Sequence, residues 1–467
     1  MDFNNLNKAI QAKIGFNESY DVGLREINIF KRKINIYFLT GLVDNLQVIE
    51  IVKGIIDIPK EIDVDFEIIK EYLAHHNANE INTFSEIIIN ILNGLVVIIV
   101  EDSDTYLAID VRSYPTRSIS EPDMEKVIRG SHDGFNENFH MNIQLVRRRI
   151  KDSRLRNELF LIGTDSPSYV CLTYIKGICP ENILNDVRGK LKNLNVPHLI
   201  MADKALEEMI IRQKKYNAYP LVRYTERADT VAVHLYQGMF ALFVDTSPSV
   251  ILAPCTLFDH MQHLEEYRQS PISGTYLRLI RYLGIFVSLF LAPIWLILLK
   301  NNKLSGILEI LVPSEEAKLG IFLQVLAAEV GVEFLRMASI HTPSSLSTAM
   351  GLIAGILIGD MAIRMGVFTT QTVLLVALSA IGTYVTPSYE LGLANKITKI
   401  LFILSILLFN YYGFIITILL WILYLGRIKS FGKSYLYPVL PFNLKRILKI
   451  FIRFPYQNKN KPKKGES

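Results

Sequence analysis

The sequence predicts an α/β soluble N-terminal region of two subdomains, followed by an all-α polytopic membrane domain. Charged residues recur every few positions up to Arg268, whereas long stretches after Tyr282 carry almost none. Strand and helix patterns alternate before Pro271, and after it come apolar runs long enough to cross a bilayer. These three observations place the change from soluble to membrane-embedded chain near Pro271.

The chain has 467 residues, which exceeds the usual size of one domain and favours two or three folding units. We predict α/β subdomains at residues 1–115 and 116–270, a transmembrane domain at residues 271–427 and a basic cytoplasmic tail at residues 428–467. No internal repeat is evident in the soluble region. Because the tail is rich in lysine and arginine and the N-terminal residues lack the pattern of a secretory leader, we expect both ends on the cytoplasmic side.

In the first subdomain, residues 34–39 are expected to form a strand and residues 43–56 an amphipathic helix. The β-branched run at residues 94–100 is too short to span a bilayer and predicts a buried strand. We expect it to form a hairpin with residues 106–111 across an acidic turn.

The second subdomain shows a similar alternation of patterns. We expect a strand at residues 169–175, two strands within residues 231–244 about Gln237 and Gly238, and helices at residues 137–151, 180–194 and 203–214. These segments predict a second α/β unit.

The predicted membrane domain contains apolar segments at residues 282–299, 317–337, 347–365, 372–385 and 397–425. About four to six crossings fit these lengths, and an even number agrees with two cytoplasmic ends. The last segment is interrupted at Tyr411, Tyr412 and Gly413. It is therefore either one tilted span or two halves that meet at the glycine.

Three charged residues within the segment 317–337 are the main candidates for function. Glu329, Glu333 and Arg336 are spaced four and three residues apart, so they project from one face of a helix. A carboxylate in hydrocarbon is costly unless it is paired or hydrated, so this face should meet water or protein. One hypothesis is a cation pathway lined by both glutamates, with Arg336 paired to Glu333. The alternative is a helix at the membrane interface whose charges are solvated.

Small residues recur at every fourth position in the next segment, at Ser347, Gly351, Gly355 and Gly359. Such a ridge lets a neighbouring helix approach closely, so we predict a helix-packing role for it.

Asp360 and Arg364 follow four residues apart near the end of the same segment. They form either an intrahelical ion pair or charges at the mouth of a pore.

Several classes of function are disfavoured. No phosphate-binding glycine loop, nucleophile elbow or HExxH motif occurs, so we expect neither an enzyme nor a cofactor. The net charge of +5 is too small to indicate a nucleic-acid-binding protein. The run of arginines at residues 147–149 is explained by the attraction of a helix C-terminus for cations.

A metal site is likewise not expected. The cysteines Cys171, Cys179 and Cys255 form no CxxC pair and are expected to be reduced and buried. On a continuous helix His260, His263 and Glu266 would share one face, but no convincing fourth ligand is present. The charged residues around them predict a solvated surface helix instead.

Several sequence blocks resemble the A-subunit family of bacterial spore germination proteins, the GerA family. The most specific are RSISEP at residues 117–122, VIRGSHDGFNE at residues 127–137 and LVRRRI at residues 145–150. PSVILAP at residues 248–254 and SFG at residues 430–432 follow in the order that the family shows. The resemblance covers nearly the whole chain.

Within that family the chain is most similar to the stage V sporulation AF branch. The blocks that indicate this are HLEEYRQ at residues 263–269, EFLRMASIHTP at residues 333–343 and IGTYVTPSYELG at residues 381–392. Nutrient-receptor A subunits usually have arginine and proline where His341, Thr342 and Pro343 stand. This difference argues against direct nutrient sensing.

The resemblance implies a multi-pass protein of the spore inner membrane that takes part in ion release when germination begins. It also implies a homo-oligomeric ion channel that works beside germination receptor subunits, with a small membrane protein as partner. Our leading hypothesis is therefore an oligomeric cation channel subunit. The alternative is a non-conducting scaffold that organises germination receptors. A transporter is a third reading, but it should show two corresponding broken helices, and only one clear break is present.

Overall fold

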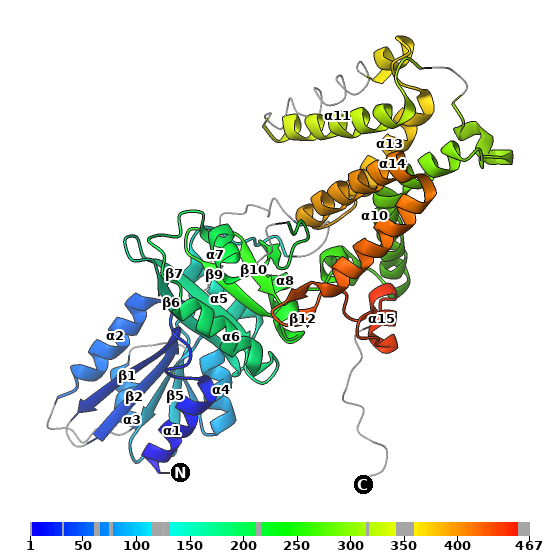
Figure 1. Ribbon diagram of the computed structural model, residues 1–467. Coiled ribbons are helices and arrows are strands. Elements are labelled where there is room, and N and C mark those ends of the chain that lie inside the picture. Colours follow the sequence, from blue (N-terminus) through cyan, green and yellow to red (C-terminus); the bar gives the residue numbers. More distant parts are fainter. Residues whose placement is uncertain are drawn as a thin grey trace, which may run out of the picture. The chain divides into compact units, whose positions relative to one another are not determined.

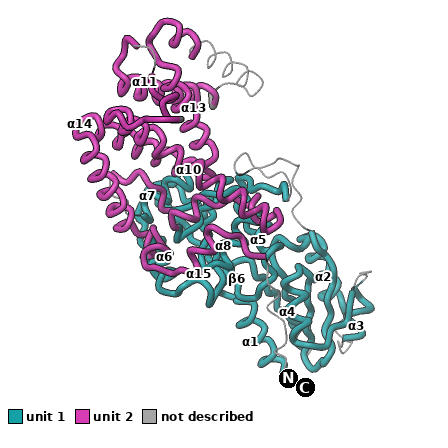
Figure 2. The backbone as a smooth tube through the Cα atoms, turned by 90° about the vertical axis from the view of Figure 1, so that its right-hand side faces the viewer, with its two compact units in different colours: residues 1–213, 222–255, 430–432 teal, residues 214–221, 256–429, 433–467 magenta. Residues whose placement is uncertain are grey.

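The structure of the protein is a computed structural model, which describes residues 2–29, 32–59, 66–73, 78–113, 125, 131–211, 216–313, 317–341 and 359–455 (Figure 1). The chain forms two compact units (Figure 2). The first, here called the soluble unit, comprises residues 1–213, 222–255 and 430–432, and the second, the helical unit, comprises residues 214–221, 256–429 and 433–467. The subdomain boundaries inferred from the sequence stay predictions.

The first half of the soluble unit is a five-stranded antiparallel sheet in the order β1-β2-β4-β5-β3. Its strands are β1 (Val22–Ile29), β2 (Arg32–Leu39), β3 (Ala78–Ile81), β4 (Val96–Val100) and β5 (Tyr106–Ile109). Its helices are α1 (Phe3–Ile14), α2 (Asn45–Ile56), α3 (Phe66–Tyr72) and α4 (Phe84–Leu92).

Strand β4 lies at the centre of this sheet and is buried on both faces. Val96 and Ile98 pack with α2 and α3, whereas Val97 and Ile99 pack with α1 and α4. A strand that is covered on both sides needs an unbroken apolar run, which is what its sequence contains. The predicted buried strand and its hairpin with β5 are confirmed.

The second half is also a five-stranded antiparallel sheet, in the order β6-β7-β9-β10-β8. Its strands are β6 (Leu155–Ile162), β7 (Ser168–Ile175), β8 (Arg223–Thr225), β9 (Phe240–Val244) and β10 (Val250–Ala253). Its helices are α5 (Phe139–Arg149), α6 (Glu181–Lys192), α7 (Ala202–Ile210) and α8 (Ala228–Tyr236).

The two halves repeat one topology. Each runs helix, two strands, two helices, strand, helix and two strands, and the corresponding strands occupy the same places in the two sheets. The repeat was missed in the sequence because matching topology requires only matching patterns of burial, not matching residues.

The prediction of two strands within residues 231–244 is wrong in its first half. Residues Ala228–Tyr236 form helix α8, and only β9 follows as a strand. Val231 and Leu235 are two residues of an alternating apolar pattern, but they are also four residues apart, and with Ala228 they make one buried helical face. Packing against the second sheet decides between the two periodicities.

The helical unit contains α9 (Leu264–Arg268), α10 (Pro271–Lys300), α11 (Ile321–His341), α13 (Thr370–Tyr384), α14 (Tyr389–Arg427) and α15 (Leu444–Phe451). The short elements η1 (Asp259–Met261), η2 (Gly306–Leu311), β11 (Lys429–Ser430) and β12 (Lys433–Ser434) complete the described part. Within that part, α10 and α14 are long and apolar enough to cross a membrane. Helix α10 begins at Pro271, where the composition of the sequence changes.

Helix α14 is a helical hairpin rather than one straight helix. Asn410 has non-helical backbone angles (φ 54°, ψ −139°). The ring of Phe402 lies 5.6 Å from that of Phe414 and 5.9 Å from that of Trp421. In a straight helix residues 402 and 421 would be about 28 Å apart, so the two halves must run antiparallel. Of the two alternatives drawn from the sequence, the structure has two halves, with the break one residue before Tyr411.

The first half of α14 ends in carbonyl groups that need donors. Lys300, at the end of α10, supplies them, because its ammonium group donates to the carbonyls of Ile406 (3.1 Å) and Leu407 (3.2 Å). A cation at a helix C-terminus is favourable both as a donor and toward the helix dipole.

Close helix packing occurs between α10 and α13. A Cβ atom on Gly382 would lie only 2.3 Å from the carbonyl oxygen of Gly284, so a side chain there would force the helices apart. Of the predicted ridge, Ser347, Gly351 and Gly355 lie outside the described residues. A Cβ on Gly359 would meet nothing within 4 Å, and the packing role of this ridge stays a prediction.

The two halves of the soluble unit are joined by a buried ion pair. Arg147 Nε of α5 lies 2.8 Å from Asp21 Oδ2, and both side chains are almost completely buried. Burial alone would raise the pKa of Asp21, but the Arg147 charge and hydrogen bonds from Arg147, Ser19 and Asn157 outweigh it and hold the pKa below its ordinary value of 3.8. Arg147 therefore belongs to an internal contact, which the helix-terminus explanation of the arginine run did not foresee.

Replacing Asp21 should destabilise the soluble unit. Asp21→Asn leaves the Arg147 guanidinium buried without a counter-ion, a change that costs about 3–5 kcal/mol. We expect a lower midpoint in chemical unfolding followed by circular dichroism at pH 7. Glu26→Gln, at an exposed site on β1, is the matched control and should leave the midpoint unchanged.

The same pair predicts a pH dependence. A carboxyl group whose pKa is depressed on folding contributes stability above its unfolded pKa and loses it as the pH falls through the folded value. The wild-type chain should therefore lose stability below pH about 4, and Asp21→Asn should lose less. Identical acid unfolding curves for the two chains would contradict this assignment.

Candidate functional site: buried charges in the helical unit

Helix α11 carries the charged residues that the sequence singled out. It is helical from Ile321 to His341, so Glu329, Glu333 and Arg336 do lie on one helix. The side chain of Glu329 is 7% exposed and that of Glu333 is 26% exposed. These residues are therefore packed against other elements, and the alternative of a solvated face does not describe Glu329.

Glu329 is paired with a lysine of α14. Lys399 Nζ lies 2.6 Å from Glu329 Oε1, and the lysine side chain is 1% exposed. The same ammonium group donates to Ser379 Oγ of α13 at 2.9 Å, and the Ser379 hydroxyl donates to the carbonyl of Ser288 in α10 at 3.0 Å. One buried charge pair thus joins α11 and α14, and the serine extends it to α13 and α10.

Glu333 forms a second group one turn along α11. Its carboxylate pairs with Lys396 of α14 and accepts a hydrogen bond from Arg336 Nε at 2.9 Å. The Arg336 guanidinium lies over the ring of Tyr389, 4.7 Å from its centre. Arg336, Lys396 and Tyr389 also line a cavity of about 160 Å³ at the start of α14.

The two groups together contain two carboxylates and three cations. Transfer of one unpaired charge into an apolar interior costs several kcal/mol, whereas a hydrogen-bonded pair is tolerated. Within the chain the glutamates are therefore neutralised by lysines and arginine. Their proposed role in lining an ion pathway stays a prediction, now with counter-ions that the sequence analysis did not name.

Lys396 and Lys399 are the functional candidates that sequence reasoning missed. They stand three residues apart at the start of a long apolar stretch, where lysines are unusual. Acidic residues on one apolar helix and basic residues on another are a signal for pairing. It does not reveal which of the apolar helices will meet.

Polar side chains continue along α13 on either side of Ser379. Thr372 is fully buried and donates to Gln324 Oε1 of α11 at 3.1 Å, and Thr383 lines the cavity beside Arg336. Because Thr372, Ser379 and Thr383 recur at spacings of seven and four, they follow one face of the helix. A polar stripe thus passes through helices that are otherwise apolar.

The other predicted pair, Asp360 and Arg364, differs from these groups because it is exposed. Asp360 and Arg364 form an ion pair of 2.8 Å with each other, four residues apart, and both side chains are exposed. The pairing agrees with the intrahelical alternative.

The expectation of a solvated helix around His263 is wrong. His260 lies in η1, whereas His263 is the N-cap residue of α9, so they do not share a helical face with Glu266. Glu266 is completely buried and pairs with Arg278 (2.6 Å) and Arg281 of α10. Across the described residues, no group of three or more histidine, cysteine, aspartate or glutamate side chains is arranged to hold a metal ion.

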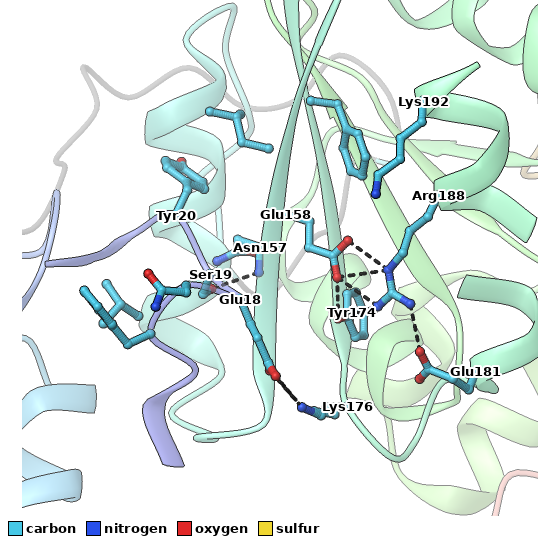
Figure 3. A pocket seen from close by; sticks show the side chains of 15 residues that line it. Glu18, Ser19, Tyr20, Asn157, Glu158, Tyr174, Lys176, Glu181, Arg188 and Lys192 are labelled. Atoms are coloured by element: carbon cyan, nitrogen blue, oxygen red, sulfur yellow. Dashed lines mark hydrogen bonds and ion pairs between the residues drawn. The ribbon is translucent and has the colours of Figure 1, made fainter. Parts of the chain in front are cut away.

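The soluble unit has a polar cavity of about 720 Å³ between β6, α6 and the chain that follows α1 (Figure 3). Five of its charged side chains form ion pairs with each other. Arg188 contacts Glu158 (2.8 Å) and Glu181 (2.7 Å), and Glu18 contacts Lys176 (2.7 Å). The hydrogen bonds that Arg188 donates to Glu158 raise the pKa of Arg188. The hydrogen bonds that Glu18 accepts from Arg156 and Lys176 lower the pKa of Glu18. Because these charges are compensated internally, we assign no ligand to this cavity.

Comparison with known proteins gives matches over nearly the whole chain. The profile of the Bacillus/Clostridium GerA spore germination protein family matches residues 9–464. Stage V sporulation protein AF of Bacillus subtilis (strain 168) is 42% identical over 445 residues, covering 94% of this chain and 90% of that protein. Spore germination protein A1 of the same organism is 30% identical, covering 91% of this chain and 88% of that protein.

Among solved structures, a match is found to the N-terminal domain of the A subunit of the Bacillus megaterium spore germinant receptor GerK3. The TM-score is 0.42 at 24% identity, and the alignment covers 54% of this chain and 94% of that domain.

The Glu329–Lys399 pair predicts strong energetic coupling. Glu329→Gln or Lys399→Gln alone leaves one buried charge without a partner and should cost about 3–5 kcal/mol. The double variant removes both charges and should recover much of the loss. Thermal unfolding of the full chain in detergent measures this cycle. Glu309→Gln, at an exposed site in η2, is the matched control, and additive effects of the two single changes would contradict the coupling.

Proposed function

The chain belongs to the Bacillus/Clostridium GerA spore germination protein family, and on this premise we propose that it is a cation-conducting subunit in the spore inner membrane. It would contribute to ion release during germination. In this proposal the helical unit crosses the membrane several times, and the soluble unit and the basic tail lie in the cytoplasm.

The observation that carries the proposal is the set of buried charges on α11 and α14. Ionisable residues within apolar helices face the interior of a bundle or a hydrated path, and they commonly mark routes for ions. Glu329 and Glu333 supply negative charge, which attracts cations, and the polar stripe of α13 runs beside them. An interaction made only for packing would not need so many ionisable groups in one place.

The paired lysines suggest how the path is kept closed. The ammonium group of Lys399 occupies the position in front of Glu329 that a permeating cation would take, and Lys396 does the same at Glu333. If α11 and α14 moved apart, the carboxylates would lose these internal counter-ions and could bind cations from solution instead. Lysine and permeating ion thus compete for the same carboxylate.

A segment of chain between α7 and β8 contacts α14 next to the Lys399–Glu329 pair. Tyr219 belongs to the helical unit, where its hydroxyl hydrogen-bonds with Thr398 (2.8 Å) and accepts from Trp421 Nε1 (2.6 Å). Thr398 is the neighbour of Lys399 in α14. The chain on both sides of this segment continues into the soluble unit, so movement there would reach Tyr219 through the backbone and α14 through these hydrogen bonds.

Partners are part of the proposal. Leu323, Val330, Phe334 and Met337 form an exposed apolar stripe along α11, beside the charged face. A helix with such a stripe is suited to contact lipid or a second copy of the chain, as a homo-oligomeric channel requires. We also propose a small membrane protein and germination receptor subunits as partners, since the relatives include proteins named spore germination proteins.

Cation flux tests the proposal directly. The full chain, purified with its co-expressed membrane partner, would be reconstituted in liposomes and potassium release measured. Lys399→Gln should raise the flux by about tenfold, because it removes the internal counter-ion of Glu329 and so destabilises the closed state. Glu333→Gln should lower the flux, and Glu309→Gln should leave it unchanged.

Variants that are not monodisperse in size-exclusion chromatography would be excluded from the comparison. Absence of flux in the wild-type chain and in every variant, with germination receptors still co-purifying, would favour the scaffold instead.

A further inference from the structure

Helix α15 (Leu444–Phe451) has three different faces. Ile450 is buried in the helical unit. Leu444, Leu448 and Phe451, at positions i, i+4 and i+7, are 58%, 44% and 42% exposed and form an apolar strip. Lys445, Arg446 and Lys449 occupy the remaining face. The helix is thus attached along one edge and presents an apolar strip bordered by cations.

The position of α15 is fixed by contacts with α10. Arg278 donates two hydrogen bonds to the carbonyls of Lys449 (2.9 Å) and Ile450 (3.1 Å), and the Tyr282 hydroxyl donates to the same Ile450 carbonyl (3.1 Å). The rings of Tyr282 and Phe451 lie 5.3 Å apart. Because these carbonyls end α15 and have no partners within the helix, Arg278 and Tyr282 determine where it ends and how it is oriented.

The contacts also place α15 at a particular depth. Arg278 and Arg281 are the last charged residues of α10 before the uncharged stretch that begins at Tyr282. Under the proposed membrane crossing of α10, this is where the chain passes from the headgroup region into hydrocarbon. Helix α15 contacts α10 at residues 278 and 282, so it lies at the boundary between membrane and water.

The residues on either side of α15 add further exposed apolar side chains and cations. Phe442 before the helix and Phe454 after it are also exposed, at 73% and 50%. Further along the sequence come Lys459, Lys461, Lys463 and Lys464, with Glu466 as the one acidic residue among them. Exposed aromatic rings together with clustered cations fit a surface that is apolar at one depth and negatively charged just above it.

We propose that α15 is a lipid-binding helix that lies in the headgroup region and binds anionic phospholipids. Leu444, Leu448 and Phe451 insert into the boundary of the acyl chains, and Lys445, Arg446 and Lys449 contact the phosphates. A protein partner would need a matching acidic groove, whereas an anionic bilayer supplies both the apolar layer and the negative charge at the depth where α15 lies. The inference rests on the proposed membrane crossing of α10, but not on ion conduction.

The test follows the environment of position 448 in the full chain. Leu448→Cys would be labelled with the fluorophore NBD, whose emission reports polarity, and the native cysteines are buried. The chain would be reconstituted in phosphatidylcholine vesicles with and without about one third phosphatidylglycerol. A matched probe would be placed by Ile200→Cys, at an exposed site in the soluble unit.

The anionic vesicles should give at least threefold lower quenching of the probe at position 448 by acrylamide, with emission shifted to the blue. The probe at position 200 should be quenched equally in both vesicles. Lys445→Gln, Arg446→Gln and Lys449→Gln together should return the probe at position 448 to the level seen in phosphatidylcholine, because the attraction to phosphate is lost.

Free quenching at position 448 in both vesicles would overturn the proposal. Equal protection in both vesicles and in detergent would also overturn it, and would indicate a second copy or another protein on this face. If the probe is protected only in vesicles with phosphatidylglycerol and the chain gives no potassium flux, the lipid site would be supported and the channel proposal would be contradicted. Release of the chain from vesicles by alkaline washing would overturn both proposals.

Discussion

The helical unit depends on the cost of placing a charge among apolar helices. Lys399 and Glu329 are each tolerable in the interior only because the other is 2.6 Å away. Since one residue is on α14 and the other on α11, this requirement selects one arrangement of the two helices, with Ser379 of α13 as an additional acceptor. Apolar packing alone would allow many sliding positions, whereas the ion pair has one.

A related constraint acts at the ends of the helices. Helix α10 carries a cation near each of its ends, and each one satisfies the exposed carbonyls of another helix. Arg278 donates to the end of α15, and Lys300 donates to the end of the first half of α14. The last carbonyl groups of a helix have no partners within that helix, so donors from another helix stabilise them. Helix α10 therefore organises the helical unit at both of its ends.

The family assignment and the geometry support each other at different levels. Membership in the spore germination family rests on similarity over nearly the whole chain. The paired charges add a specific hypothesis about mechanism, in which lysines of α14 compete with permeating cations for the carboxylates of α11. Within the soluble unit, Asp21 and Arg147 join two halves of equal topology.

The sequence by itself determined the features that depend on local composition and period. These are the change of character at Pro271, the buried β4 and β5 hairpin, and the helix that carries Glu329, Glu333 and Arg336. Only the tertiary structure decided the features that depend on which distant segments meet. The apolar pattern of residues 228–236 fits both a helix and a strand, and packing on the second sheet selects the helix. The sequence around Glu266 predicts a solvated side chain, whereas Glu266 is buried and paired with Arg278. Lys396 and Lys399 became site residues through contacts with a helix more than 60 positions earlier in the chain. The period of apolar residues predicts which face of a helix or strand is buried. Which other helix or strand packs against that face depends on the fold of the whole chain.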